Sequence, residues 1–203
     1  MDYKKYIFPI NSTTDGSGVV VGDLFITAGH VIKDGIKPSV VINGKSYPLD
    51  KENAILFDTN SEIRSDGLDV AVFRMNEICS PLHLADFIPS KGEGLLSCFY
   101  RHTVSCDSGL SSNIFSSKIN EDWLFEQRKG IVTSLFDNFF ECQFIESLSE
   151  GSSGSPIFYN DKVVGVLYGD KEGKNSSKTV LFLSSYAIIK KLITINYYKV
   201  DNL

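Results

Sequence analysis

Short apolar runs separated by turn residues make up most of the sequence, and this spacing limits the chain to an all-β fold. The runs are rich in β-branched and aromatic residues. They occupy Val19–Val21, Leu24–Thr27, Ser39–Ile42, Ser46–Leu49, Ala54–Phe57, Val70–Phe73, Leu95–Tyr100, Ile131–Leu135, Phe139–Phe144, Pro156–Tyr159, Val163–Tyr168 and Thr179–Ser184. Repeated short runs of this kind, bounded by Gly, Asn, Asp or Ser, are typical of β-sandwiches and β-barrels.

Two dipeptides and the C-terminal segment refine this prediction. The dipeptides NG at 43–44 and ND at 160–161 stand between apolar runs. They predict hairpin turns, because the central residues of such turns need positive φ. The C-terminal run YAIIKKLI has its apolar residues at helical spacing, and Ser184 or Ser185 can cap it. We therefore expect one terminal helix in an otherwise β protein.

The number of predicted strands indicates how many β units the chain forms. Its 203 residues suffice for one large domain or two small ones. About a dozen strands are more than one small sheet holds, and the apolar runs fall into two groups on either side of Ala85–Gly94. We expect two β units, residues 1–88 and residues 89–203, and the second also contains the helix.

Charge and composition exclude several classes of function. The formal net charge is −5, from 20 Lys and Arg against 25 Asp and Glu, so no basic field is present to hold nucleic acid or an anionic membrane. No apolar segment reaches the roughly 18 residues of a membrane span, and the N-terminal apolar run is too short for a signal peptide. The four cysteines form no CxxC pair. We therefore expect reduced thiols, a cytoplasmic protein and no metal site.

Three segments place a reactive side chain in a constrained setting. His30 ends an apolar strand in TAGH, where a fixed imidazole can serve as a general base. Asp69 directly precedes the apolar strand of DVAV, so its carboxylate can orient a histidine. Ser153 in GSSGSP has glycines at positions −2 and +1, which let the backbone turn tightly and present its N–H groups. A base, a carboxylate and a serine framed by glycines are what acyl transfer by a serine needs.

TAGH, DVAV and GSSGSP, in this order, resemble the His, Asp and Ser motifs of the chymotrypsin-like serine proteases. KGIVTSL at 129–135 and KVVGVLYG at 162–169 resemble the strands that flank the nucleophile loop in bacterial HtrA-type proteases, here without a PDZ domain. The resemblance covers most of the chain. It implies an all-β fold of two six-stranded antiparallel β-barrels with a C-terminal α-helix, and an active site in the cleft between the barrels.

The resemblance also implies a role for each residue of the site. His30 would be the general base, Asp69 its orienting partner and Ser153 the nucleophile of a serine endopeptidase. The N–H groups of Gly151 and Ser153 would form the oxyanion hole. Such an enzyme acts on protein or peptide substrates and needs neither a metal nor a cofactor.

By the same resemblance, Ser147, Leu167, Tyr168 and Gly169 build the primary specificity pocket, with residues 181–183 near its far wall. No acidic residue stands at Ser147, the expected floor of this pocket. Because an unpaired buried cation is costly, we predict that the enzyme does not favour Lys or Arg at the cleaved residue.

The chain departs from the family in ways that bear on its activation. Digestive relatives pair a newly cut N-terminus with an aspartate just before the nucleophile, and Ser152 occupies that position here. The site is therefore either formed as synthesised or ordered by a separately encoded activator. Gly29 replaces a more usual alanine of the histidine motif, a change that we expect to cost little beyond backbone rigidity.

Alternatives stay open for the nucleophile and for the function. Ser152 and Ser155 lie in the same loop but lack a glycine at position −2, and Cys142 has no glycine frame. A protease-like domain can also bind peptides or scaffold a partner without turnover. A viral polyprotein-processing protease would share the size and the missing disulfides.

Overall fold

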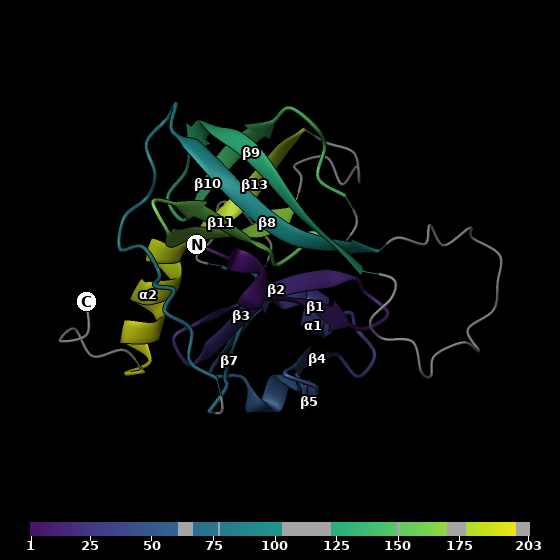
Figure 1. Cartoon of the computed structure of the whole chain (residues 1–203). Coiled ribbons are helices and arrows are strands. Elements are labelled where there is room, and N and C mark those ends of the chain that lie inside the picture. The colour runs from purple at the N-terminus through teal and green to yellow at the C-terminus, as the bar shows by residue number, and fades with distance from the viewer. Residues whose placement is uncertain (61–66, 77, 103–122, 150, 170–177, 198–203) are drawn as a thin grey trace.

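The computed structural model describes residues 1–60, 67–76, 78–102, 123–149, 151–169 and 178–197. Almost all of the regular structure in these residues is antiparallel β-strand, arranged in two sheets. In Figure 1 the sheet from the C-terminal half of the chain lies above the sheet from the N-terminal half, and the last helix packs beside them. The predicted all-β class is confirmed.

The N-terminal sheet contains seven strands in the order β5-β4-β1-β2-β3-β7-β6. Their bounds are β1 Ile7–Asn11, β2 Gly16–Val21, β3 Leu24–Ala28, β4 Ser39–Ile42, β5 Lys45–Pro48, β6 Leu56–Asp58 and β7 Val70–Arg74. Every residue of β2 and β3 is buried. Alternate side chains of these strands pack inside the N-terminal unit and against the C-terminal barrel, so burial on both faces explains their near-continuous apolar sequence.

The C-terminal sheet closes into a six-stranded barrel in the order β10-β13-β12-β11-β8-β9. Its strands are β8 Gly94–His102, β9 Trp123–Leu135, β10 Phe139–Phe144, β11 Pro156–Tyr159, β12 Lys162–Gly169 and β13 Thr179–Ser184. Phe99, Phe140 and Phe182 are fully buried in the barrel interior. The rings of Phe140 and Phe182 stack with centroids 5.6 Å apart. Phenylalanine rings thus pack together with aliphatic side chains in the barrel interior.

The N-terminal unit differs in detail from the expected six-stranded barrel. Its sheet has seven strands, and among the described residues these strands do not close into a ring. The edge strands β5 and β6 have four and three residues, which leaves little backbone for pairing one edge with the other. Both predicted hairpin turns are present, because Asn43, Gly44, Asn160 and Asp161 all have positive φ.

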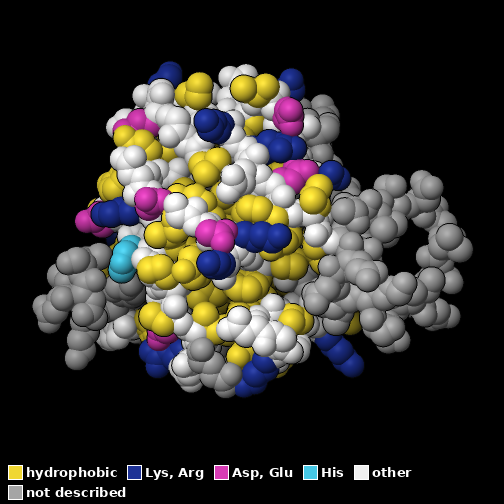
Figure 2. Space-filling view, in the orientation of Figure 1, with side chains coloured by type: hydrophobic (Ala, Val, Ile, Leu, Met, Phe, Trp, Pro, Cys, Tyr) yellow, Lys and Arg dark blue, Asp and Glu magenta, His cyan; other side chains and the backbone are white. Residues whose placement is uncertain are grey.

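A third apolar cluster joins the two sheets to each other and to helix α2 (Ser185–Thr194). Tyr3 in the short helix η1 (Tyr3–Lys5) stacks on Phe158 with ring centroids 4.1 Å apart, and its hydroxyl donates to Asp161 at 2.5 Å. Burial and the Asp161 carboxylate raise the pKa of Tyr3. Hydrophobic side chains gather at the middle of the face in Figure 2, where the two sheets meet in Figure 1. This cluster sets the relative position of the two sheets.

Helix α2 begins at the predicted cap. The Ser184 hydroxyl accepts a hydrogen bond from the N–H of Ala187 at 3.2 Å, as expected of a helix N-cap. Within the described ranges, no helix has the length and apolarity to cross a bilayer.

Candidate active site

His30 and Asp69 meet where β3 ends and β7 begins. The antiparallel register pairs Ala28 with Val70, so the residues just beyond this pair are neighbours, and His30 stands there in the short helix α1 (Gly29–Lys33). The Asp69 carboxylate contacts His30 twice. Its Oδ2 lies 2.6 Å from the ring Nδ1, and its Oδ1 accepts the backbone N–H at 2.8 Å. This two-point contact fixes the ring relative to the carboxylate.

The two side chains differ in their exposure to solvent. That of Asp69 is 2% exposed and that of His30 is 31% exposed. A carboxylate at Nδ1 favours the tautomer with its proton on Nδ1, which leaves the lone pair on Nε2. Asp69 also has a φ of +46°, a left-handed conformation that Asp tolerates better than most residues. The arrangement is that of a histidine held at one ring nitrogen and ready to accept a proton at the other.

Close packing requires glycine at position 29, which corrects the expectation that this substitution costs little. A Cβ on Gly29 would lie 2.1 Å from the carbonyl oxygen of Asp58 and 3.1 Å from Oδ1 of Asp69. The backbone would have to move to admit it. Glycine therefore lets the end of β6 pack against the turn that positions His30, a tertiary contact that the local sequence does not reveal.

The loop before β11 contains Ser153 within the predicted glycine frame. Gly151 and Gly154 have φ values of +88° and +78°, and both therefore use the left-handed region that glycine enters freely. Ser153 is partly exposed, whereas Ser152 and Ser155 are 7% and 0% exposed. Of these three serines, Ser153 is the accessible one.

The backbone N–H groups of this loop divide into two sets. Those of Ser152, Gly154 and Ser155 donate to backbone carbonyls at 3.2, 2.9 and 3.0 Å. Those of Gly151 and Ser153 donate to no protein acceptor in the described part of the chain. The N–H groups of Gly151 and Ser153, on either side of Ser152, are thus available to an external acceptor.

Ser17 on β2 connects the N-terminal sheet to this loop and to the C-terminal barrel. Its N–H donates to the carbonyl of Ser153 at 2.8 Å. Its hydroxyl donates to the carbonyl of Gly151 at 2.9 Å and accepts the N–H of Tyr100 at 3.0 Å. Ser17 is fully buried, and Thr27 donates to its carbonyl at 2.8 Å. Sequence reasoning missed Ser17, although a polar residue in the apolar run GSGVVV is a signal that could have found it.

We predict that Ser17→Ala destabilises the protein by about 1–3 kcal/mol, because it leaves a buried carbonyl and a buried N–H without their partner. It also releases the loop around Gly151, so any reaction at Ser153 should slow. Chemical denaturation measures the first effect and the rate of reaction with a fluorophosphonate measures the second. Ser184→Ala, which removes the cap of α2, is the matched control and should lower stability without slowing the reaction. Equal rates in both variants would contradict a positioning role for Ser17.

The nucleophile loop packs against the strand that leads to His30. A Cβ on Gly154 would lie 2.2 Å from Oγ1 of Thr27 and 2.7 Å from the backbone nitrogen of Ala28. Ser153 adjoins this glycine, and His30 lies just beyond Ala28, so the structure brings both residues into one region. Although both residues are described, no hydrogen bond joins the Ser153 hydroxyl to the His30 ring.

The residues predicted to build the specificity pocket lie in different environments. Ser147 is exposed and Gly169 is partly exposed at the end of β12. Leu167 is 2% exposed, and its side chain packs in the barrel interior. Only the backbone of this residue can therefore line a cleft. Tyr168 packs edge-on against Phe139, with ring centroids 5.4 Å apart. The side chains of Leu167 and Tyr168 therefore belong to different apolar clusters.

Two of the cysteines, Cys98 and Cys142, do not compete with Ser153 as nucleophiles. Cys98 and Cys142 are fully buried, and burial raises the pKa of each thiol to about 12. A thiol with such a pKa is protonated at neutral pH and therefore unreactive. Among the residues that the structure describes, no group of three or more His, Cys, Asp or Glu side chains could hold a metal ion.

Comparisons with known proteins identify the fold. No protein-family model and no curated protein matches the sequence. The active form of the Rv3671c protease from M. tuberculosis matches with a TM-score of 0.66 at 16% identity, over 97% of this chain and 83% of that one. The inactive form of the Rv3671c protease matches with a TM-score of 0.62 at 18% identity, over 95% and 90%. The scabies mite inactivated protease paralogue S-I1 matches with a TM-score of 0.64 at 17% identity, over 97% and 96%.

These likenesses confirm the chymotrypsin-like two-barrel fold that the sequence motifs implied. The matched structures include a protease in its active form and an inactivated paralogue. The fold alone therefore does not decide whether this chain is an enzyme, because activity depends on its own side chains.

Proposed function

We propose that the chain is a serine endopeptidase that hydrolyses peptide bonds through an acyl-enzyme on Ser153. The observation that supports this most directly is the contact of His30 with Asp69, whose buried carboxylate holds both the ring Nδ1 and the backbone N–H of the histidine. Burying a carboxylate is costly unless it is paired. A cleft that only binds peptides has no need for this arrangement beside an accessible serine.

In the proposed reaction, Oγ of Ser153 attacks the substrate carbonyl carbon while Nε2 of His30 takes the hydroxyl proton. Asp69 stabilises the resulting imidazolium at Nδ1. When the tetrahedral intermediate collapses, the peptide C–N bond breaks and His30 passes the proton to the leaving amine. Water then attacks the ester with His30 again as the base, which releases the acid and restores the serine hydroxyl.

The N–H groups of Gly151 and Ser153 are the proposed donors to the oxyanion. The Ser152 N–H donates to the Ser149 carbonyl, and Gly151 just before Ser152 has a φ of +88°, a conformation that glycine adopts freely. A Cβ on Gly151 would lie 2.8 Å from the carbonyl oxygen of Tyr100, so a larger residue would shift the loop. Each oxyanion donor contributes about 3–4 kcal/mol in enzymes of this type.

Cleavage of a mixed peptide library, with the new termini read by mass spectrometry, tests this proposal without a known substrate. We expect hydrolysis that stops after treatment with a sulfonyl fluoride and persists in a metal chelator. Hydrolysis that survives the sulfonyl fluoride, or no hydrolysis at all, would contradict the proposed function.

The same library tests the specificity prediction. The exposed Ser147 carries no charge, and the carboxylate of the neighbouring Glu146 lies 3.1 Å from Nε of Arg128. A substrate Lys or Arg would therefore meet no dedicated anion, and we expect cleavage after uncharged residues to be at least about tenfold faster. Preferential cleavage after Lys or Arg would show that this prediction is wrong, and Glu146→Gln would then test Glu146 as the anion.

A second candidate is a domain that holds peptides without turnover. The observation in its favour is the lack of a hydrogen bond between the Ser153 hydroxyl and the His30 ring, both of which the structure describes. Such bonds are often long in enzymes without substrate, and a separately encoded activator or the substrate itself would have to tighten this one. Saturable peptide binding without any cleavage, with and without candidate partners, would favour this candidate.

A further inference from the structure

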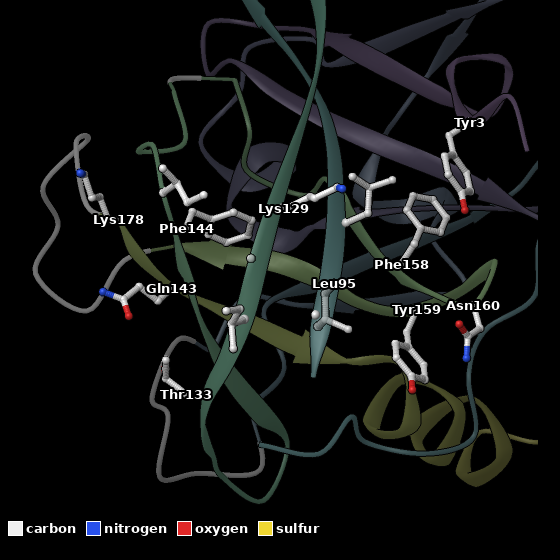
Figure 3. Close-up of a pocket in the computed structure, with 15 residues that line it drawn as sticks. Tyr3, Leu95, Lys129, Thr133, Gln143, Phe144, Phe158, Tyr159, Asn160 and Lys178 are labelled. Atoms are coloured by element: carbon white, nitrogen blue, oxygen red, sulfur yellow. The ribbon is translucent and has the colours of Figure 1, made fainter. Parts of the chain in front are cut away.

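An open groove of about 870 Å³ runs over the C-terminal barrel, lined mainly by residues of β8, β9, β10 and β11. Two strands cross the middle of the view in Figure 3. Tyr3 and Phe158 lie on one side of them, and Gln143 and Lys178 lie on the other. None of the residues of the proposed catalytic site lines it. Its volume is within the range of ligand-binding sites, so this groove needs an explanation other than the chemistry at Ser153.

Two large apolar side chains stand exposed in this groove. Ile131 is 55% exposed and Ile145 is 83% exposed. Gly94 faces Ile131 across the β8–β9 pair, and a Cβ there would meet no atom within 4 Å. Beside it, Gly130 lies over the ring of Phe144. Exposed apolar surface beside two glycines of the groove is characteristic of an interaction site.

The charge of the groove is opposite to that of the whole chain. Among the residues that the structure describes, its lining contains Lys129 and Lys178 and no Asp or Glu, although the chain has a net charge of −5. Neither lysine has an ion pair with any residue that the structure describes. Two acidic residues next to the groove have partners of their own: Glu141 accepts hydrogen bonds from the hydroxyls of Thr133 and Ser134 at 2.8 and 3.2 Å, and Glu146 lies 3.1 Å from Nε of Arg128. The groove is therefore complementary to negative charge.

The two lysines stand apart across the sheet. Lys129 is on β9 and Lys178 directly precedes β13, and β10 lies between these strands. Two strand spacings of about 4.8 Å separate them by about 10 Å or more. This spacing suits two carboxylates on one extended chain better than a single small anion.

We propose that this groove binds an extended segment of a protein that combines apolar side chains with carboxylates. The apolar side chains would pack on Ile131 and Ile145, the backbone would pass over Gly94, and the carboxylates would meet Lys129 and Lys178. Binding here uses neither Ser153 nor His30, so the proposal does not depend on peptidase activity. In an active enzyme, such a segment would be held outside the catalytic cleft.

Two peptide arrays test the proposal with purified Ser153→Ala protein, which removes the proposed nucleophile. In one array, peptides of about ten residues have random sequences of Leu, Phe, Glu and Ser. In the other array, Lys replaces every Glu. We expect binders in the Glu array, with affinities that fall as salt rises, and none in the Lys array. No binders, or equal binding to both arrays, would overturn the proposal.

Variants locate the binding. Gly94→Phe fills the groove at a position with open space, and Lys129→Glu with Lys178→Glu reverses its charge. We expect each to weaken binding by about tenfold or more. Ile36→Glu is the matched control, because Ile36 is 69% exposed and does not line the groove. Unchanged binding in the charge-reversed protein, with native thermal stability, would place the peptide elsewhere and overturn the proposal.

Discussion

Replacing Ser153 with alanine is expected to lower the rate of peptide hydrolysis by about 10⁶-fold. The change removes the attacking oxygen and leaves the backbone N–H groups of the loop in place. Ser153 is partly exposed and its hydroxyl makes no hydrogen bond within the described part of the chain. Stability should therefore change by less than about 0.5 kcal/mol. The measurements are kcat on a peptide cleaved by the parent protein and the thermal midpoint of each variant.

Ser155→Ala is the matched control for this change. Its hydroxyl is buried and has no hydrogen-bond partner among the residues that the structure describes, so its removal should preserve both folding and activity. If Ser153→Ala kept full activity, or if Ser155→Ala lost it, the assignment of the nucleophile would be wrong.

Asp69→Asn is expected to lower kcat by about 10⁴-fold with little change in KM. Asn has one acceptor oxygen where Asp has two, and the backbone N–H of His30 needs that oxygen. The amide NH₂ then faces Nδ1, which must accept the hydrogen bond. The ring proton moves to Nε2, where it blocks uptake of the proton from Ser153. The substitution therefore stabilises the wrong tautomer of a correctly placed ring.

Steady-state kinetics and fluorophosphonate reaction rates measure this effect on folded protein. Asp58→Asn is a suitable control, because the Asp58 side chain accepts the backbone N–H of Asn60 at 2.8 Å, a bond that the amide oxygen of Asn can also accept. It should keep near-parent activity. If Asp69→Asn retained more than about a tenth of the parent kcat, Asp69 would not orient the base.

The local sequence predicted the strands, the hairpins and the paired histidine and aspartate. Runs of β-branched residues and the NG and ND turns are local signals, and the structure confirms them. His30 contacts Asp69 because β3 ends beside the point in the sheet where β7 begins. The catalytic roles of these residues and the cytoplasmic location stay predictions.

Other features depend on contacts between distant segments, so the local sequence could not predict them. Gly29 is required by the carbonyl of Asp58. The hydroxyl of Ser17 joins Gly151 to Tyr100, residues far apart in the chain. The seven-stranded order of the N-terminal sheet likewise depends on which short edge strands pair. Periodicity gives no information on any of these contacts.

Intact-mass analysis after incubation with a fluorophosphonate detects an activated serine, because phosphonylation needs such a serine and no known substrate. We predict one adduct on the parent protein, located on Ser153 by peptide mapping, and none on Ser153→Ala or His30→Ala. No adduct on the parent protein, or an adduct that persists in Ser153→Ala, would contradict it.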